Sequence, residues 1–153
     1  VYIRFGRAAV PVVHEEAGYT FKIGKAEVLR GGTDIAVVAT GLMVAEALTA
    51  ADTLAAEGIS VRVINVCSIK PLDEETILAA ARECGKIVTC EEHSVIGGLG
   101  EAVCSLVSEK YPVPVRRVGV NDEFGHSGPA TALLEEMGLC ASHIADVVRE
   151  SVR

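Results

Sequence analysis

Two carboxylates and an imidazole stand side by side at Glu91, Glu92 and His93, at the end of a strand expected over 86–91. Such side chains perform acid and base catalysis, and open α/β sheets bind ligands at the carboxyl ends of their strands. Because neighbouring side chains on a strand point to opposite faces, only Glu91 and His93 are expected to share a face. No Ser, Cys or third ligand lies at a motif distance, so the pattern favours a structural or interface role over acid-base catalysis.

A glycine-rich turn follows at Gly97, Gly98 and Gly100, before an expected helix. Free backbone amides at a helix start can hold phosphate or carboxylate groups, so the turn is a candidate anion site. It does not match the dinucleotide fingerprint, because Val103 stands where the third glycine belongs. Any tight connection from strand to helix needs similar glycines, and this structural interpretation is the favoured one.

His126 lies in the turn-rich segment 124–129, which favours a surface or domain-contact role over catalysis. His14 and His143 have no sequence neighbours that indicate a site. The sequence contains no Walker loop, no G-x-S-x-G elbow and no H-E-x-x-H motif, and its five cysteines lack zinc-type spacing. The residues alone therefore identify no catalytic, cofactor-binding or metal-binding side chain.

The composition narrows the class of protein. The 153 residues are 50% hydrophobic and carry a net charge of -7, and no apolar run approaches the roughly 18 residues that a membrane span needs. We expect a soluble globular protein of the cytoplasm with reduced cysteines. The negative charge argues against nucleic acid as the main partner.

The elements that must position these residues alternate between apolar runs and helical periodicity, which is typical of a mostly parallel sheet with helices on both faces. Strands are expected over 34–39, 60–66, 86–91 and 113–120, and helices over 44–55, 74–84, 99–109, 133–137 and from a cap at Ser142 onward. Asp73 and Gly85 are expected to cap the helix over 74–84. A further strand over 26–29 is followed by a turn too short for a crossover helix, so it should pair antiparallel at the sheet edge.

The first residues suggest a domain boundary. Segment 1–12 alternates apolar residues and runs into Pro11, which predicts the last strand of a preceding domain. A linker is expected over 13–24 and the main domain over 25–153. The chain is thus interpreted as a piece of a larger enzyme.

A series of short segments supports a more specific interpretation. In order they are Ile3-Arg4-Phe5-Gly6-Arg7, Lys25-Ala26-Glu27-Val28-Leu29-Arg30, Ala39-Thr40-Gly41, Val63-Ile64-Asn65, Ile69-Lys70-Pro71-Leu72-Asp73, Glu91-Glu92-His93, Gly97-Gly98-Leu99-Gly100 and Phe124-Gly125-His126-Ser127-Gly128. Over essentially the whole chain, this order resembles the C-terminal domain of transketolase. It is closest to the C-terminal half of the split, two-subunit transketolases. The domain also resembles the ends of deoxyxylulose phosphate synthase and of the pyruvate dehydrogenase beta subunit.

The resemblance implies a three-layer α/β/α domain with a mixed, mostly parallel five-stranded sheet and one antiparallel edge strand. It implies a parent enzyme that moves a two-carbon ketol unit between sugar phosphates, as in the pentose phosphate pathway. Thiamine diphosphate and Mg²⁺ would be held by pyrimidine and pyrophosphate domains outside this chain, in the same polypeptide or in a separate N-terminal subunit. The chain alone would be inactive and would serve packing and assembly in a homo-oligomer such as a dimer.

By the same resemblance, Arg7 matches the arginine that binds the phosphate of the sugar substrate. A guanidinium suits that task because its two N–H groups can meet two phosphate oxygens. Without the resemblance, Arg7 would be interpreted as an arginine solvated in a linker. The alternatives for the whole protein are a thiamine-dependent 2-oxo acid dehydrogenase beta subunit, a deoxyxylulose phosphate synthase, and a free-standing anion or nucleotide binding module.

Overall fold

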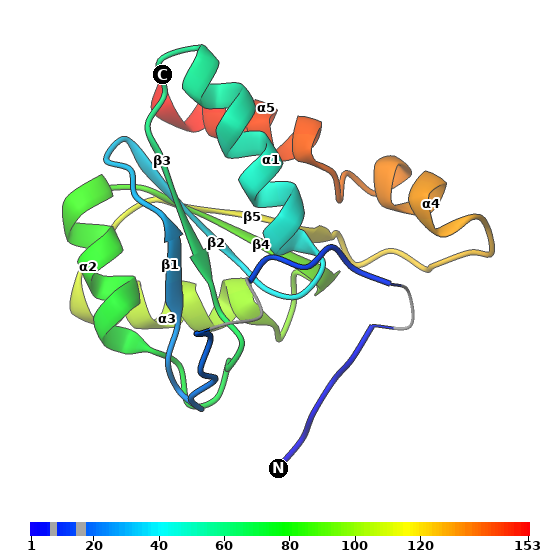
Figure 1. Ribbon diagram of the computed structural model, residues 1–153, viewed down its shortest axis with the longest axis horizontal. Coiled ribbons are helices and arrows are strands. Elements are labelled where there is room, and N and C mark those ends of the chain that lie inside the picture. The colour runs from blue at the N-terminus through cyan, green and yellow to red at the C-terminus, as the bar shows by residue number, and fades with distance from the viewer. Residues whose placement is uncertain (7–8, 15–17) are drawn as a thin grey trace.

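The computed structural model describes residues 1–6, 9–14 and 18–153, and its centre is a single mixed sheet (Figure 1). The strands are β1 (Glu27–Arg30), β2 (Ile35–Ala39), β3 (Val61–Asn65), β4 (Ile87–Ser94) and β5 (Val115–Val120). Their order across the sheet is β1-β3-β2-β4-β5, with β1 antiparallel to β3 and every other pair parallel. The predicted antiparallel edge strand is confirmed.

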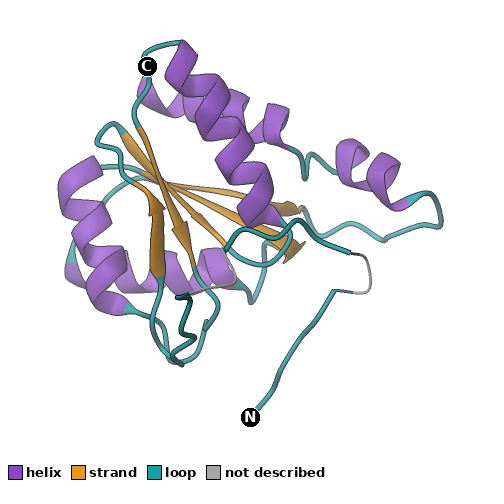
Figure 2. Ribbon diagram, viewed as in Figure 1, coloured by secondary structure: helices purple, strands orange, loops and turns teal. Residues whose placement is uncertain are grey.

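Helices cover both faces of the sheet, which makes the three layers that the sequence predicts (Figure 2). They are α1 (Met43–Ala56), α2 (Glu74–Cys84), α3 (Leu99–Lys110), α4 (Ala130–Glu136) and α5 (Ala141–Val152). Helices α1 and α5 pack in one hydrophobic core, and α2 and α3 pack in the other. In the described part of the chain, no helix has the length and apolar character to cross a membrane.

Strand β2 lies between the two cores, and all five of its side chains are buried. Its sequence is apolar throughout because helices cover both of its faces. The next strand along the chain, β3, pairs with β2 from Ile35↔Val61 to Ala39↔Asn65. Parallel pairing aligns the carboxyl ends of β2, β3 and β4 at one edge of the sheet, which we call the carboxyl edge.

The caps of α2 confirm the sequence prediction. The Asp73 carboxylate accepts a hydrogen bond from the backbone nitrogen of Thr76 at 3.2 Å, and Gly85 ends the helix with a φ of 68°. Asp73 also accepts from the backbone nitrogen of Ala26 at 3.0 Å, so it joins α2 to the segment before β1. Burial opposes the charged form, but these N–H donors and Lys25 outweigh it and hold the pKa of Asp73 below its ordinary value.

The predicted cap of the last helix at Ser142 is wrong. Cys140 occupies the N-cap position of α5, and the backbone nitrogen of Ala141 donates to the Glu46 carboxylate of α1 at 2.7 Å. A long-range side chain therefore satisfies this helix start, and nothing local in the sequence indicates it. Helix α4 begins at Ala130, directly after Pro129, which is earlier than the expected 133–137.

The described residues of segment 1–12 adopt no strand, and the chain end at Val1 projects from the main body (Figure 1). A strand needs a neighbour to pair with, and the expected neighbour would belong to a preceding domain. The assignment of this segment to such a domain stays a prediction.

Candidate functional site

The carboxyl edge of the sheet contains a buried acid at the end of β4. Glu91 is only 2% exposed, and one of its carboxylate oxygens accepts from the backbone nitrogen of Leu99 at 2.7 Å. The other oxygen accepts from the backbone nitrogen of Gly100 at 2.8 Å. Both nitrogens lie at the start of α3, where backbone N–H groups lack partners within the helix and the dipole favours a negative charge. Glu91 thus acts as a long-range cap of α3.

This arrangement corrects the anion-site interpretation of the Gly97, Gly98 and Gly100 turn. The amides that an external anion would use already donate to the protein's own carboxylate. The glycines are explained by that packing: a Cβ at Gly98 would lie 2.0 Å from a Glu91 carboxylate oxygen, and one at Gly100 would lie 2.8 Å from the Arg117 side chain. Gly97 has a φ of 77°, which favours glycine. This geometry supports the structural interpretation, in which the glycines allow a tight connection from β4 to α3.

Strand β4 bulges directly after Cys90. The pairing of β4 with β5 runs to Cys90↔Val118 and resumes at Ser94↔Val120, so Glu91, Glu92 and His93 face Gly119 alone. A Cβ at Gly119 would lie 2.9 Å from the backbone oxygen of His93, which explains the glycine opposite the bulge. Bulges of this kind redirect side chains at the rims of sheets.

The bulge separates the two residues that the sequence places on one face. Glu91 is buried, whereas Glu92 and His93 are exposed, so the expected pairing of Glu91 with His93 is wrong. The alternation rule fails here because extra residues in one strand shift which way the following side chains point. The Nδ1 atom of His93 lies 2.8 Å from the backbone oxygen of Ser94, which holds the ring at the surface.

The described N-terminal segment contacts this bulge. A guanidinium nitrogen of Arg4 donates to the backbone oxygen of Glu92 at 3.0 Å. A Cβ on Gly6 would lie 4.0 Å from the Glu92 carboxylate. Arg7, the expected phosphate ligand, lies outside the described residues, so its role stays a prediction.

A second polar cluster lies at the carboxyl edge, beside the end of β3, and we call it the linker cluster. Its members are His14, Tyr19, Glu27, Asn65 and Cys67. The His14 and Tyr19 rings stack with their centroids 3.8 Å apart, and His14 Nδ1 lies 3.4 Å from a Glu27 carboxylate oxygen. On the other side, His14 Nε2 lies 3.4 Å from the amide nitrogen of Asn65, whose oxygen accepts from the Cys67 thiol at 3.4 Å.

The linker cluster fixes the predicted linker to the domain, and sequence reasoning missed it. His14 has no informative neighbours in the sequence, and its contact with Asn65 joins residues 51 positions apart along the chain. Burial raises the pKa of Tyr19 to about 12, with further contributions from the Cys67 contact and the charge of Glu27. The phenol therefore stays protonated at neutral pH.

His126 lies in the segment that leads to α4, and its side chain is half exposed. Its Nε2 atom lies 3.3 Å from a carboxylate oxygen of Glu136, at the end of α4. This position agrees with a surface or contact role. Its neighbour Phe124 is fully exposed at 101%, although a phenyl ring gains more than most side chains from burial. The 121–130 segment thus carries a large apolar side chain that is exposed to solvent.

Three of the five cysteines are poor candidates for nucleophilic chemistry. All five cysteines are free thiols, and Cys84 and Cys90 are buried. Burial raises the pKa of the Cys84, Cys90 and Cys104 thiols above its ordinary value. These three thiols are protonated at neutral pH and are therefore poor nucleophiles.

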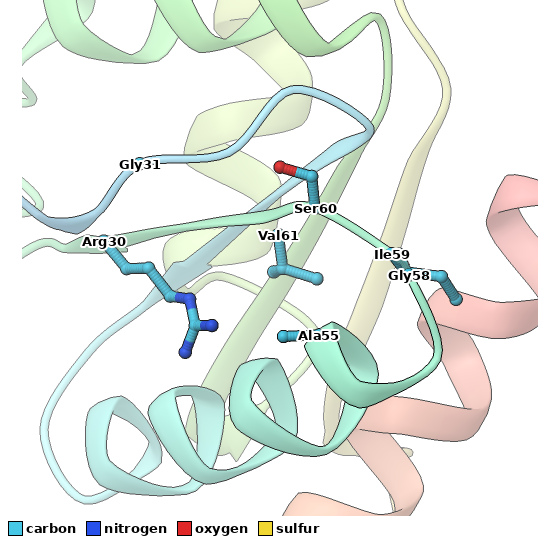
Figure 3. Close-up of a pocket in the computed structure, with 7 residues that line it drawn as sticks. All are labelled: Arg30, Gly31, Ala55, Gly58, Ile59, Ser60 and Val61. Atoms are coloured by element: carbon cyan, nitrogen blue, oxygen red, sulfur yellow. The ribbon is translucent and has the colours of Figure 1, made fainter.

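A shallow pocket of about 270 Å³ lies near the opposite edge of the sheet, where β3 begins (Figure 3). It is lined by Arg30, Gly31, Ala55, Gly58, Ile59, Ser60 and Val61. Its one charged lining residue, Arg30, is paired with Asp52 of α1. Among residues 1–6, 9–14 and 18–153, no group of three or more His, Cys, Asp or Glu side chains could hold a metal ion.

Comparison with known proteins gives the family. The model of the transketolase C-terminal domain matches residues 24–144. A solved structure described as a split gene transketolase, inactive beta4 tetramer, superposes with a TM-score of 0.91 and is 49% identical. It covers 96% of this chain, and the match takes 48% of that chain.

Three curated relatives match almost the entire chain. A 6-deoxy-6-sulfo-D-fructose transketolase subunit of Clostridium sp. (strain MSTE9) is 48% identical over 98% of this chain and 46% of its own length. An apulose-4-phosphate transketolase subunit of Phocaeicola vulgatus is 44% identical over 100% of this chain and 49% of its own length. The 1-deoxy-D-xylulose-5-phosphate synthase of Heliobacterium modesticaldum is 45% identical over 98% of this chain and 24% of its own length.

The chain spans about half the length of the two subunit relatives and a quarter of the synthase. The family match covers residues 24–144, which include the whole sheet. The mixed sheet with its antiparallel edge strand agrees with that match. The chain therefore belongs to the transketolase family and represents its C-terminal domain.

Proposed function

We propose that this chain is the packing and assembly domain of a thiamine diphosphate-dependent transketolase of the split type. The parent enzyme transfers a two-carbon ketol unit between sugar phosphates in the carbohydrate metabolism of the cytoplasm. The observation that carries this proposal is the 49% identity to a split gene transketolase over 96% of the chain. The identical subunits of that tetramer favour a homo-oligomer here, together with a separate N-terminal partner subunit.

In this proposal the catalytic centre lies in the domains outside this chain. The described residues supply no acidic cluster for Mg²⁺, and the polar groups of Glu91 and Asp73 are occupied by backbone amides of the domain itself. Neither of these two carboxylates is therefore available to a metal ion or cofactor. Thiamine diphosphate and Mg²⁺ would be bound by the pyrimidine and pyrophosphate domains of the parent.

Exposed apolar side chains support a packing role. Large apolar residues that stand exposed include Val1, Tyr2, Ile3, Phe5, Tyr19, Phe21, Ile23, Ile69 and Phe124. Most belong to the N-terminal segment and the linker, which lead into the preceding domain in the proposed parent. Large apolar side chains that are exposed in one stretch of chain favour a surface that another domain covers.

Arg7 is proposed as the one residue of this chain that touches substrate, through the phosphate of the sugar. The Arg7→Ala enzyme should then show a much higher KM for phosphorylated sugars and an unchanged KM for unphosphorylated ones. The sugar donor and acceptor are chosen by the domains outside this chain, in line with the different substrates in the names of the subunit relatives.

The experiment is a coupled assay of ketol transfer from xylulose 5-phosphate, with thiamine diphosphate and Mg²⁺, on this chain alone and on the complete parent assembly. Activity in the assembly alone supports the proposal. Activity of the isolated chain would contradict it.

A deoxyxylulose phosphate synthase is the second candidate, because one such enzyme is 45% identical over 98% of the chain. The complete parent would then condense pyruvate with glyceraldehyde 3-phosphate and lack ketol transfer. Decarboxylation of pyruvate without that condensation would instead indicate a 2-oxo acid dehydrogenase beta subunit. A free-standing anion-binding module has less support, since Glu91 already occupies the amides of the glycine-rich turn.

A further inference from the structure

The 121–130 segment leaves the sheet beside the turn that follows β4. The backbone oxygen of Val120, the last residue of β5, accepts from the backbone nitrogens of Val95 at 2.9 Å and Asp122 at 3.0 Å. Asp122 has a φ of 51°, a left-handed conformation that few residues other than glycine adopt. A hydrogen bond and an uncommon backbone conformation therefore set the direction of the segment, which runs outward from the sheet to α4 (Figure 1).

The far end of the segment is attached to α4. A Cβ on Gly128 would lie 3.2 Å from the Leu133 side chain, so the backbone there lies directly on the helix. His126 adds its contact with Glu136 at 3.3 Å. Phe124 lies between the two attached ends, and its ring is fully exposed. A side chain held in this way loses little further conformational freedom when a partner binds it.

Ile96 adds a second exposed apolar side chain to this part of the carboxyl edge. It is 53% exposed and directly follows Val95, which the hydrogen bond to Val120 joins to the end of β5. Large apolar side chains are thus exposed on two neighbouring segments. That pattern favours contact with another protein surface over incidental exposure of a single residue.

The chain around Phe124 is acidic. Over residues 118–148 the sequence has no Lys or Arg, and its acidic residues are Asp122, Glu123, Glu135, Glu136 and Asp146. Asp122 and Glu123 directly precede Phe124, and both are exposed. Arg117 of β5 lies close by, but its guanidinium donates to the backbone oxygen of Val95 at 2.9 Å. The complementary surface is therefore one with Lys or Arg residues around an apolar pocket.

The same charge disfavours a second copy of this chain as the partner. A symmetric contact between two copies would set Asp122 and Glu123 against the same residues of the other copy, and like charges repel across an interface. Each copy also carries a net charge of -7. The charge therefore favours a different chain.

We propose that the 121–130 segment is the surface that binds the separate N-terminal subunit of the split parent. Phe124 fills an apolar pocket on that subunit, and Asp122 and Glu123 lie against Lys or Arg residues at the rim of the pocket. This inference rests on the proposed function for the existence of that subunit. The contacts, exposure and charge that support it are those of this chain.

The test uses the complete subunit that contains this chain and the N-terminal subunit of the same parent, prepared separately and mixed in a calorimetric titration. Phe124→Ala should raise the Kd roughly thirtyfold or more, the loss typical of an aromatic side chain at the centre of an interface. Phe124→Leu keeps an apolar side chain and should lose less. Tyr111→Ala is the matched control, because Tyr111 is 41% exposed at the far end of α3 and should leave the Kd unchanged.

A charge reversal tests the acidic rim. Glu123→Lys should raise the Kd about three- to tenfold at low ionic strength, and the difference from wild type should shrink as salt is added. Glu109→Lys makes the same change of charge at an exposed position in the last turn of α3 and should have little effect. A Glu123→Lys subunit that binds like Glu109→Lys would contradict the role of the rim.

The outcomes separate this inference from the proposed function. If the wild-type subunits neither bind each other nor transfer ketol units, the proposed function fails and the docking surface fails with it. If they bind and are active but Phe124→Ala binds as tightly as wild type, the docking surface alone is wrong. With the Kd unchanged, fewer Phe124→Ala subunits per assembly would show that a second copy covers the segment. A lower Tm of the separate variant subunit would instead show that a domain of the same polypeptide covers it.

Discussion

The buried carboxylate of Glu91 lies 2.7 Å from the backbone nitrogen of Leu99, eight residues later in the chain. This contact closes the loop between β4 and α3 with an internal hydrogen bond and uses the donors that a ligand would otherwise take. The same geometry gives the protein a rigid bulge at the carboxyl edge. The Glu91 carboxylate thus joins the end of β4 to the start of α3.

Glu91→Gln should destabilise the domain by about 1–3 kcal/mol, because an amide group cannot accept both backbone N–H donors and one buried donor loses its partner. For a chain of this size, each kcal/mol lowers the Tm by about 2–4 °C. Glu92→Gln changes the exposed neighbour and should shift the Tm little. Thermal unfolding of the two variants checks the prediction, and equal shifts would contradict it.

Gly98→Ala should destabilise the domain by about 1–3 kcal/mol or more, because the new Cβ would lie 2.0 Å from the Glu91 carboxylate and force it to move. Gly125→Ala is the matched control, since a Cβ there meets nothing within 4 Å. Denaturant unfolding curves compare the two substitutions. A Gly98→Ala protein as stable as Gly125→Ala would show that the Glu91 contact is not tight.

Asp73→Ala should cost about 1 kcal/mol at neutral pH, the usual value of a helix N-cap. The pKa of Asp73 lies below its ordinary value of 3.8, so its stabilising contribution is present above that pH and is lost as the pH falls through the lower, folded-state pKa. The difference in unfolding free energy between wild type and variant should therefore shrink in acid. Glu75→Ala alters an 88% exposed carboxylate of the same turn and should have a much smaller effect. If the difference in unfolding free energy between wild type and Asp73→Ala stays constant into acid, the lowered pKa of Asp73 is contradicted.

His14→Ala should loosen the linker, because it removes the ring that stacks on Tyr19 and contacts Glu27. Stacking of this kind is worth about 0.5–1.5 kcal/mol, so trypsin should cleave at Lys22 about two- to tenfold faster. His126→Ala removes a surface histidine elsewhere and serves as the control. Unchanged cleavage in His14→Ala would mean that the linker cluster does not hold the linker.

Much of the fold could be predicted from the sequence, because local signals agree with the tertiary structure. Three features could be predicted from nearby residues alone. They are the uniformly apolar β2, the caps of α2 at Asp73 and Gly85, and the short turn before β2. The end of β4 could not be predicted in the same way. Alternation along a strand holds only while the ladder is regular, and the bulge opposite Gly119 breaks it.

The candidate site was predictable in its location and not in its internal contacts. The sequence placed Glu91 and the glycine-rich turn at the carboxyl edge, which the structure confirms. It left open whether the turn holds an external anion, since a single acid at a strand end does not reveal where its carboxylate will point. The Glu46 cap of α5 and the linker cluster depend on contacts between distant segments, which no local pattern encodes.

The most direct test compares the complete parent enzyme with a form that lacks residues 25–153, by measuring the number of subunits per assembly in solution and the rate of ketol transfer from xylulose 5-phosphate. If this domain serves packing and assembly, the truncated enzyme should form smaller assemblies with fewer subunits and show little or no ketol transfer. A truncated enzyme with the same number of subunits and the full rate would contradict the proposed function.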